Sequence, residues 1–223
     1  MANIFLGASL LGESGGVLPR VVVFDAMGVL YRHGNVVAGV LLPYLRSRGC
    51  VLSEAEIRAA YRSCTLGRIS TWELWAALGV ADSASDEDYC QRHELTPGAP
   101  KLLGRLRSSG VRLLALSNDA AAWSALLRAR FGLDSYIDRW LISSDLGARK
   151  PDPATYQAAI AAAGTPASEI VLVDDRPTNL LAGHAEGLRP VLFHSEDTAA
   201  NPAPDLDAPS AHGMAELYEV LAR

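Results

Sequence analysis

Val21-Val22-Val23-Phe24-Asp25-Ala26-Met27-Gly28 is the most informative segment of the chain, because four apolar residues end abruptly in an acid and a glycine follows soon after. The valines favour a packed strand, and an apolar run without alternation is typical of a central strand covered on both faces. Open α/β sheets bind ligands just past the carboxyl ends of their strands. Asp25 is therefore a candidate site residue. Taken alone, this stretch is explained equally well by an aspartate that caps a turn.

The composition describes a globular protein with one sizeable domain, or with a core and an insertion. Of the 223 residues, 49% are hydrophobic and 20% are charged, and the net charge of −5 indicates no nucleic-acid partner. We find no segment suited to crossing a membrane. The three cysteines are odd in number and lack metal-ligand spacing, which favours reduced thiols and a cytoplasmic location.

The pattern along the chain predicts four parts. Residues 1–17 are apolar and rich in glycine and serine, and we interpret them as a flexible N-terminal arm. Residues 35–95 carry helical patterns only, including two capping-box signatures that begin at Ser53 and Ser70. Residues 18–34 and 96–200 form the core, and residues 201–223 form a linker with a final helix.

Short apolar runs alternate with helical segments from residue 96 onward, which is the signature of a parallel sheet. We expect strands at 21–24, 111–116, 137–142, 170–173 and 190–193. The predicted fold class is α/β, a Rossmann-like parallel sheet with an inserted helical cap.

Polar and charged residues follow four of the expected strands. Because the carboxyl ends of parallel strands meet at one edge of the sheet, these residues are expected to converge. Each one alone is also explained as a cap for the next helix. The group contains one of only two lysines in a chain with 18 arginines, and it consists of Asp25, Ser117, Asn118, Lys150, Asp174 and Asp175.

These motifs, in this order, resemble those of the haloacid dehalogenase-like hydrolase superfamily with a helical cap after the first strand. Residues 24–30 resemble its first motif, 116–118 its second, 149–153 its third and 173–179 its fourth, so the resemblance covers roughly residues 21–193. It implies an enzyme, a hydrolase.

The resemblance also implies a role for each matching residue. Asp25 would be the nucleophile that forms an aspartyl intermediate, and Ser117, Asn118 and Lys150 would bind and neutralise the transferred group. Mg²⁺ would be held by the carboxylates of Asp25, Asp174 and Asp175 and by the backbone carbonyl of Met27. Without a cation, carboxylates so close together would repel one another and a phosphate.

One position departs from the family's phosphatases, which carry a second aspartate two residues after the nucleophile as general acid and base. Here that residue is Met27, whose thioether transfers no proton. Arg32, His33 or a residue of the cap is a candidate to supply the proton and bind substrate, although a single loop histidine is more often only solvated. Alternatively, the leaving group needs no proton.

Three functions stay open at this point. The first is a Mg²⁺-dependent phosphatase acting on a small phosphorylated metabolite. The second is a metal-free 2-haloacid dehalogenase, because halide leaves without a proton; the acid pair Asp174-Asp175 argues against it. The third is a non-catalytic binding protein on the same scaffold. We expect a monomer or homodimer that binds neither nucleic acid nor membrane.

The tyrosine and tryptophans of the expected cap, Tyr61, Trp72 and Trp75, are candidates for lining a substrate pocket. At helical spacing such residues more often belong to a core.

Overall fold

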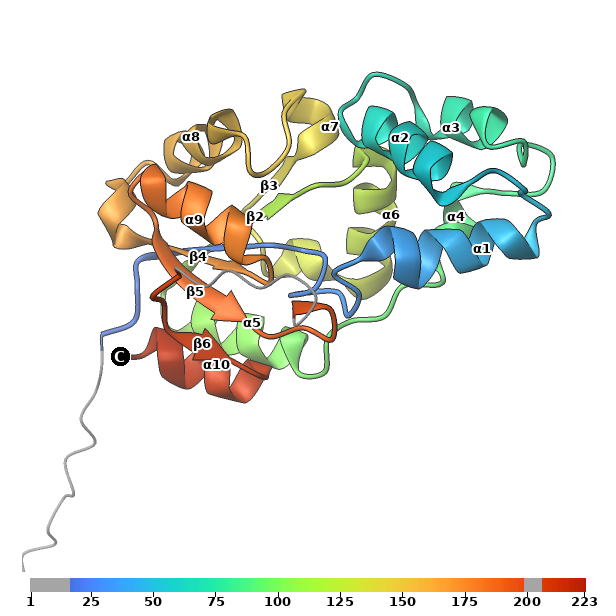
Figure 1. The fold of residues 1–223 in the computed structure, drawn as a ribbon. Coiled ribbons are helices and arrows are strands. Elements are labelled where there is room, and N and C mark those ends of the chain that lie inside the picture. The colour runs from blue at the N-terminus through green and yellow to red at the C-terminus, as the bar shows by residue number, and fades with distance from the viewer. Residues whose placement is uncertain (1–16, 199–205) are drawn as a thin grey trace, which may run out of the picture.

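The structure is a computed structural model that describes residues 17–198 and 206–223. Nearly all of the expected N-terminal arm and part of the expected linker therefore lie outside the described residues. A six-stranded parallel sheet forms the centre, with strand order β3-β2-β1-β4-β5-β6 (Figure 1). Its strands are β1 (Val21–Phe24), β2 (Arg112–Ser117), β3 (Arg139–Ile142), β4 (Ile170–Asp174), β5 (Arg189–Phe193) and β6 (Ser210–Ala211). The expected α/β fold class with a parallel sheet is confirmed.

Strand β1 lies at the centre of the sheet, between β2 and β4, and all four of its residues are buried. Val21 and Val23 belong to the apolar cluster that includes α8 (Pro153–Ala163) and α9 (Pro177–Ala185). Val22 and Phe24 belong to the cluster on the opposite face, with α5 (Ala99–Ser108) and α10 (Met214–Leu221). Because successive strand residues point to opposite faces, burial on both faces explains the unbroken apolar run.

The helical insertion, defined as residues 35–95, lies beside the sheet on the right in Figure 1. It contains a π-helical turn at Val37–Leu41 and the helices α1 (Leu42–Ser47), α2 (Glu54–Thr65), α3 (Thr71–Ala77) and α4 (Asp86–Cys90). Both predicted capping boxes are present, since Ser53 and Ser70 each exchange hydrogen bonds with the glutamate three residues later. The expected helix at 36–48 is present as one helical run, which is π-helical over Val37–Leu41 and continues as α1 to Ser47.

The remaining helices are α6 (Ala121–Phe131) and the short α7 (Ser143–Leu146), and 3₁₀ turns lie at Leu133–Ser135 and Ala167–Glu169. Strand β6 was not expected. It pairs with β5 inside the region assigned to the linker and the final helix. Two residues are too few to produce a periodic pattern, so only the pairing with β5 reveals the strand.

The two connections between the sheet and the insertion run side by side. Tyr31 forms an antiparallel bridge with Leu95, and the Arg32 backbone N–H donates to the Glu94 carbonyl over 3.0 Å. The division of the chain into core and cap at residues 34/35 and 95/96 stays a prediction.

All three cysteines are free and buried. No helix within residues 17–198 and 206–223 combines the length and apolar character required to cross a membrane.

Candidate active site

Asp25 follows β1 directly and is held at the carboxyl edge of the sheet, where its backbone N–H donates to the Val173 carbonyl over 2.7 Å. Its side chain is buried, and Oδ1 accepts from the Ala26 N–H at 2.7 Å and lies 2.9 Å from Lys150 Nζ. Burial, reinforced by Asp174 and opposed by Lys150, raises the pKa of Asp25 to about 8. The central strand thus ends in a buried carboxyl group whose negative charge must be offset by nearby positive charge.

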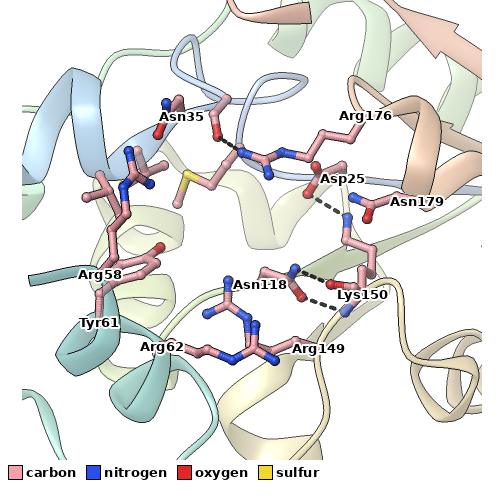
Figure 2. Close-up of a pocket in the computed structure, with 14 residues that line it drawn as sticks. Asp25, Asn35, Arg58, Tyr61, Arg62, Asn118, Arg149, Lys150, Arg176 and Asn179 are labelled. Atoms are coloured by element: carbon pink, nitrogen blue, oxygen red, sulfur yellow. Dashed lines mark hydrogen bonds and ion pairs between the residues drawn. The ribbon is translucent and has the colours of Figure 1, made fainter. Parts of the chain in front are cut away.

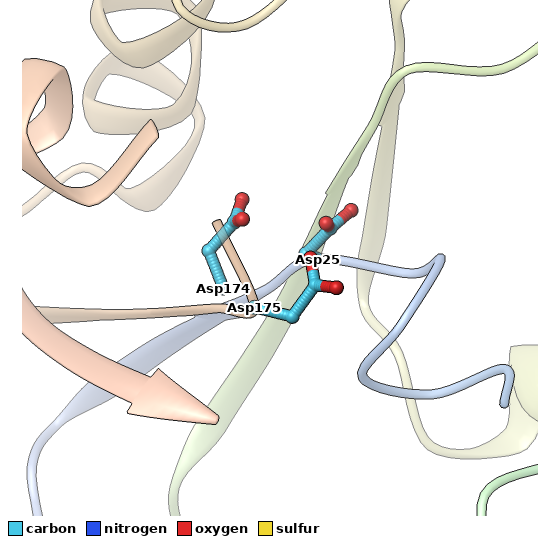
Figure 3. A group of neighbouring side chains, drawn as sticks. All are labelled: Asp25, Asp174 and Asp175. Atoms are coloured by element: carbon cyan, nitrogen blue, oxygen red, sulfur yellow. The ribbon is translucent and has the colours of Figure 1, made fainter. Parts of the chain in front are cut away.

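Asp174 and Asp175 come from the end of β4 and complete a cluster of three buried carboxylates with Asp25 (Figure 3). One oxygen from each acid lies within 4.8 Å of the others. Asp174 accepts from Lys150 Nζ at 2.6 Å and from the Asn179 amide at 3.0 Å. Lys150 pairs with Asp25 and Asp174, and its one positive charge does not balance three carboxylates, so the cluster carries an excess of negative charge.

Asp175 contributes an oxygen that the described protein leaves unpartnered. Its Oδ2 accepts from Ser195 Oγ at 2.8 Å, whereas Oδ1 is buried and has no hydrogen bond to any described residue. Burial is the main cause that raises the pKa of Asp175 to about 6, and Asp174 adds to it. A buried acceptor without a donor is costly unless a cation or water satisfies it.

Two glycines make room for Asp175. A Cβ atom on Gly28 or Gly34 would overlap its carboxylate oxygen Oδ2. Gly28 also has a φ of 90°, a conformation that other residues rarely adopt. The sequence predicts the sharp turn at Gly28, but the close approach to Asp175 is visible only in the folded chain.

Lys150 is buried between Asp25 and Asp174. Burial alone would lower the pKa of Lys150, but the two carboxylates outweigh it and hold the pKa above its ordinary value. Asn118 fixes the backbone at this point, since its Oδ1 accepts from the Lys150 N–H at 2.8 Å and its Nδ2 donates to the Lys150 carbonyl at 3.0 Å. Ser117 lies on the neighbouring strand β2, and its buried Oγ has no hydrogen bond to any described residue.

A cavity of about 240 Å³ opens over this cluster, between the strand ends and the helical insertion (Figure 2). Four of the site residues predicted from the sequence line this cavity: Asp25, Met27, Asn118 and Lys150. Arg32 and His33 are not among its lining residues. Arg32 instead forms ion pairs with Glu94 at 3.2 Å and Glu196 at 2.7 Å.

Sequence reasoning missed the cavity's most distinctive feature, which is its four arginines. They lie on α2 and on the loops beside Lys150 and Asp175, and they are Arg58, Arg62, Arg149 and Arg176. The spacing of Arg58 and Arg62, one helical turn apart on α2, is a signal that was present in the sequence.

The three cap aromatics have three different locations. Tyr61 lines the cavity, Trp75 is buried in the core, and Trp72 is 70% exposed. Only Tyr61 is thus positioned to meet a ligand in this cavity.

This fold and site define an α/β protein that presents a buried acid cluster and a lysine at the carboxyl edge of a parallel sheet. The chain belongs to the haloacid dehalogenase-like hydrolase family, whose sequence profile matches residues 19–187. The resemblance inferred from the motifs is thereby confirmed, and so is the expectation of an enzyme.

The proteins similar to this chain include phosphatases, by sequence, and dehalogenases, by fold. The chain is 33% identical over 207 residues to a phosphoglycolate phosphatase of Rhodospirillum rubrum, covering 86% of each chain. It is 29% identical over 196 residues to a phosphoglycolate phosphatase of Pseudomonas fluorescens, covering 80% of this chain and 70% of that relative. A solved L-2-haloacid dehalogenase superposes with a TM-score of 0.67 at 22% identity, covering 92% of this chain and 99% of that one. At this identity the dehalogenase shows the shared fold and leaves the chemistry open.

Proposed function

We propose that the protein is a Mg²⁺-dependent phosphatase that cleaves a small phosphate ester through an aspartyl-phosphate intermediate on Asp25. One observation carries the proposal: three buried carboxylates within 4.8 Å of one another, at the end of the central strand and beside a cavity. Two phosphatases among the relatives support the same chemistry.

The residues present fit a divalent cation. The acid cluster has more negative charge than Lys150 balances, and Asp175 Oδ1 is a buried acceptor without a donor among the described residues. Mg²⁺ prefers oxygen ligands and retains waters and phosphate oxygens. Asp25, Asp174, Asp175 and the carbonyl of Met27 would hold it, and when bound it would offset the charge of the phosphate oxygens.

Asp25 would act as the nucleophile. Its contacts with Ala26 and Lys150 both use Oδ1, which leaves Oδ2 for attack on phosphorus. The new P–O bond forms as the ester P–O bond breaks, and the leaving oxygen takes the electron pair. Water then attacks the phosphorus of the aspartyl phosphate, which releases phosphate and restores Asp25.

Lys150 and Ser117 would support this displacement. The ammonium of Lys150 stays charged between two carboxylates and offers positive charge beside the nucleophile. Ser117 Oγ is a buried hydroxyl without a described partner, so it is free to donate to a phosphoryl oxygen. Asn118, whose amide bonds to the Lys150 backbone on both sides, acts in this proposal mainly by holding that lysine in place.

The acid cluster also favours a phosphatase over the two alternatives. In a metal-free dehalogenase the buried pair Asp174-Asp175 would lack the cation that offsets its charge. A protein that only binds a ligand has no need for a nucleophilic carboxylate beside a buried lysine. The helical insertion would act as the cap, since its helix α2 contributes Arg58, Tyr61 and Arg62 to the cavity wall.

The test is a turnover panel on the purified protein with 2-phosphoglycolate, p-nitrophenyl phosphate and 2-chloropropionate, each with Mg²⁺ and with EDTA. We expect phosphate release that requires Mg²⁺ and is lost in Asp25→Asn, because the amide is not a nucleophile. Asp145→Asn, an exposed acid outside the cluster, is the matched control and should retain activity. Metal-independent chloride release would replace the phosphatase with the dehalogenase. Release of neither product would favour a binding protein.

A monomeric or homodimeric state and a cytoplasmic location stay predictions, as does the proposed cap boundary.

A further inference from the structure

The wall of the cavity is rich in positive charge although the whole chain is negative. Among the described residues its lining contains four arginines and Lys150 but a single acid, Asp25, and the chain carries a net charge of −5. Lys150 is already paired with Asp25 and Asp174. The concentration of positive charge therefore goes beyond what the acid cluster balances.

Two of these arginines, Arg62 on α2 and Arg149 in the loop before Lys150, form what we call the arginine pair. In Figure 2 their head groups lie together, on the other side of Asn118 from Asp25. Arg62 and Arg176 both contribute to lowering the pKa of Arg149, although burial contributes most. An anion bound between the two guanidinium groups would offset this repulsion at Arg149.

Neither member of the pair has a carboxylate partner within residues 17–198 and 206–223. Asp119 is near enough to oppose the pKa shift of Arg149, but the two form no ion pair. Nη1 of Arg149 is buried and has no hydrogen bond to any described residue. Its guanidinium lies 5.7 Å from the ring centroid of Tyr61, which orients it without using its donors.

The other two arginines are already engaged. Arg58 pairs with Glu54 on the same helix, and Arg176 donates to the Gly34 carbonyl at 3.2 Å. The arginine pair thus offers the cavity's unused, charged hydrogen-bond donors. Guanidinium groups match carboxylate and phosphate oxygens in geometry as well as in charge.

We propose that the arginine pair binds a second anionic group of the substrate, a carboxylate or a second phosphate, while the phosphoryl group to be transferred lies at Asp25. This inference rests on the proposed function and defines its substrate class as small phosphate esters with two anionic ends. The cavity has a volume of about 240 Å³, which suits a small substrate.

The first experiment compares two esters that differ only in the distal charge. In wild type, kcat/KM for 2-phosphoglycolate should exceed that for 2-phosphoglycolamide by about 10- to 100-fold, the usual effect of charged hydrogen bonds. Arg62→Gln and Arg149→Gln should reduce this ratio towards one by slowing phosphoglycolate alone, and Arg62→Lys should retain part of it. Arg68→Gln, an exposed arginine just after α2 that does not line the cavity, is the control and should retain the wild-type ratio.

A second arm identifies which anion is bound. Ethylene glycol bisphosphate carries a phosphate in place of the carboxylate, and the better of these two substrates shows which distal group the arginine pair selects. The inference would be overturned if, in wild type, kcat/KM for both substrates with a charged distal group were close to kcat/KM for the amide. So would a high ratio that survives in both glutamine variants.

A binding measurement separates failure of this inference from failure of the proposed function. Asp25→Asn, which cannot form the covalent intermediate, is titrated calorimetrically with 2-phosphoglycolate and with the amide. Tighter binding of the charged ligand, lost on adding Arg62→Gln, supports the arginine pair even if wild type hydrolyses neither ester. Equal affinity for the two ligands contradicts it even if wild type is an active phosphatase.

Discussion

At the scale of single residues, Met27 is the position that most limits the chemistry. It lines the cavity two residues after Asp25 and is 7% exposed, so it lies near the reacting groups and offers no proton. The arginines of the cavity do not replace a general acid, because guanidinium keeps its proton at any ordinary pH. Arg32 is held by Glu94 and Glu196, away from the cavity lining.

We therefore predict that Met27→Asp raises kcat/KM for an alkyl phosphate more than for an aryl phosphate. An alkoxide needs a proton to leave, whereas a phenolate leaves without one. General acid–base catalysis is typically worth about 10²–10⁴ in rate, so the alkyl ester has the larger gain available. The measurement is the variant-to-wild-type ratio of kcat/KM for one ester of each kind.

Met27→Leu is the matched control, because it preserves an apolar side chain of similar size and adds no acid. This variant should change kcat/KM for the alkyl and the aryl ester by the same factor. Rapid wild-type hydrolysis of the alkyl ester would contradict the premise that no acid acts here. If His33→Ala abolished that activity, His33 would be the substitute and the mechanism would need revision.

At the scale of secondary-structure elements, Asp86 joins the helical insertion to the core. Its Oδ1 accepts from Trp75 Nε1 of α3 at 2.8 Å and from Trp123 Nε1 of α6 at 2.7 Å. Its Oδ2 accepts from Thr71 Oγ1 at 2.6 Å. Both tryptophans are almost fully buried, so their indole N–H groups depend on this one carboxylate.

Replacing Asp86 with alanine should therefore lower the free energy of unfolding by about 2–4 kcal/mol, because it leaves buried donors without an acceptor. Urea denaturation followed by tryptophan fluorescence measures the change. Asp82→Ala, which removes an exposed acid from the turn before α4, should alter stability by less than about 0.5 kcal/mol. Similar losses in both variants would show that the Asp86 bonds contribute little.

At the scale of the whole molecule, the acid cluster links metal binding to folding. The unfolded chain does not hold Asp25, Asp174 and Asp175 within 4.8 Å of one another, so a cation that uses all three binds the folded state preferentially. The free energy of unfolding therefore rises as the concentration of this cation increases relative to its dissociation constant.

We predict that Mg²⁺ at about 100 times its dissociation constant raises the free energy of unfolding by about 2.7 kcal/mol and that EDTA reverses the effect. Thermal unfolding across a Mg²⁺ series measures it independently of turnover. Asp175→Asn should lose most of the effect and Asp145→Asn should retain it, because Asp145 is exposed and outside the cluster. An equal Mg²⁺ response in wild type and Asp175→Asn would exclude this site.

Local patterns in the sequence were enough to predict the parallel α/β class, the central strand that ends at Asp25, both capping boxes and the four strand ends that carry reactive side chains. These features have local signals: a run of valines, a serine three residues before a glutamate, or an acid where an apolar run stops. The parallel arrangement then implied that the strand ends share one edge, and Lys150 does lie between Asp25 and Asp174.

Contacts between segments that are distant in the sequence became visible in the folded chain. Strand β6 exists because β5 offers it a partner, and Arg62 and Arg149 line the same cavity because folding brings α2 beside the loop before Lys150. Arg32, adjacent to the site in sequence, pairs with Glu94 and Glu196 instead. Such contacts depend on the packing of the whole chain, and residue spacing carries no local signal for them.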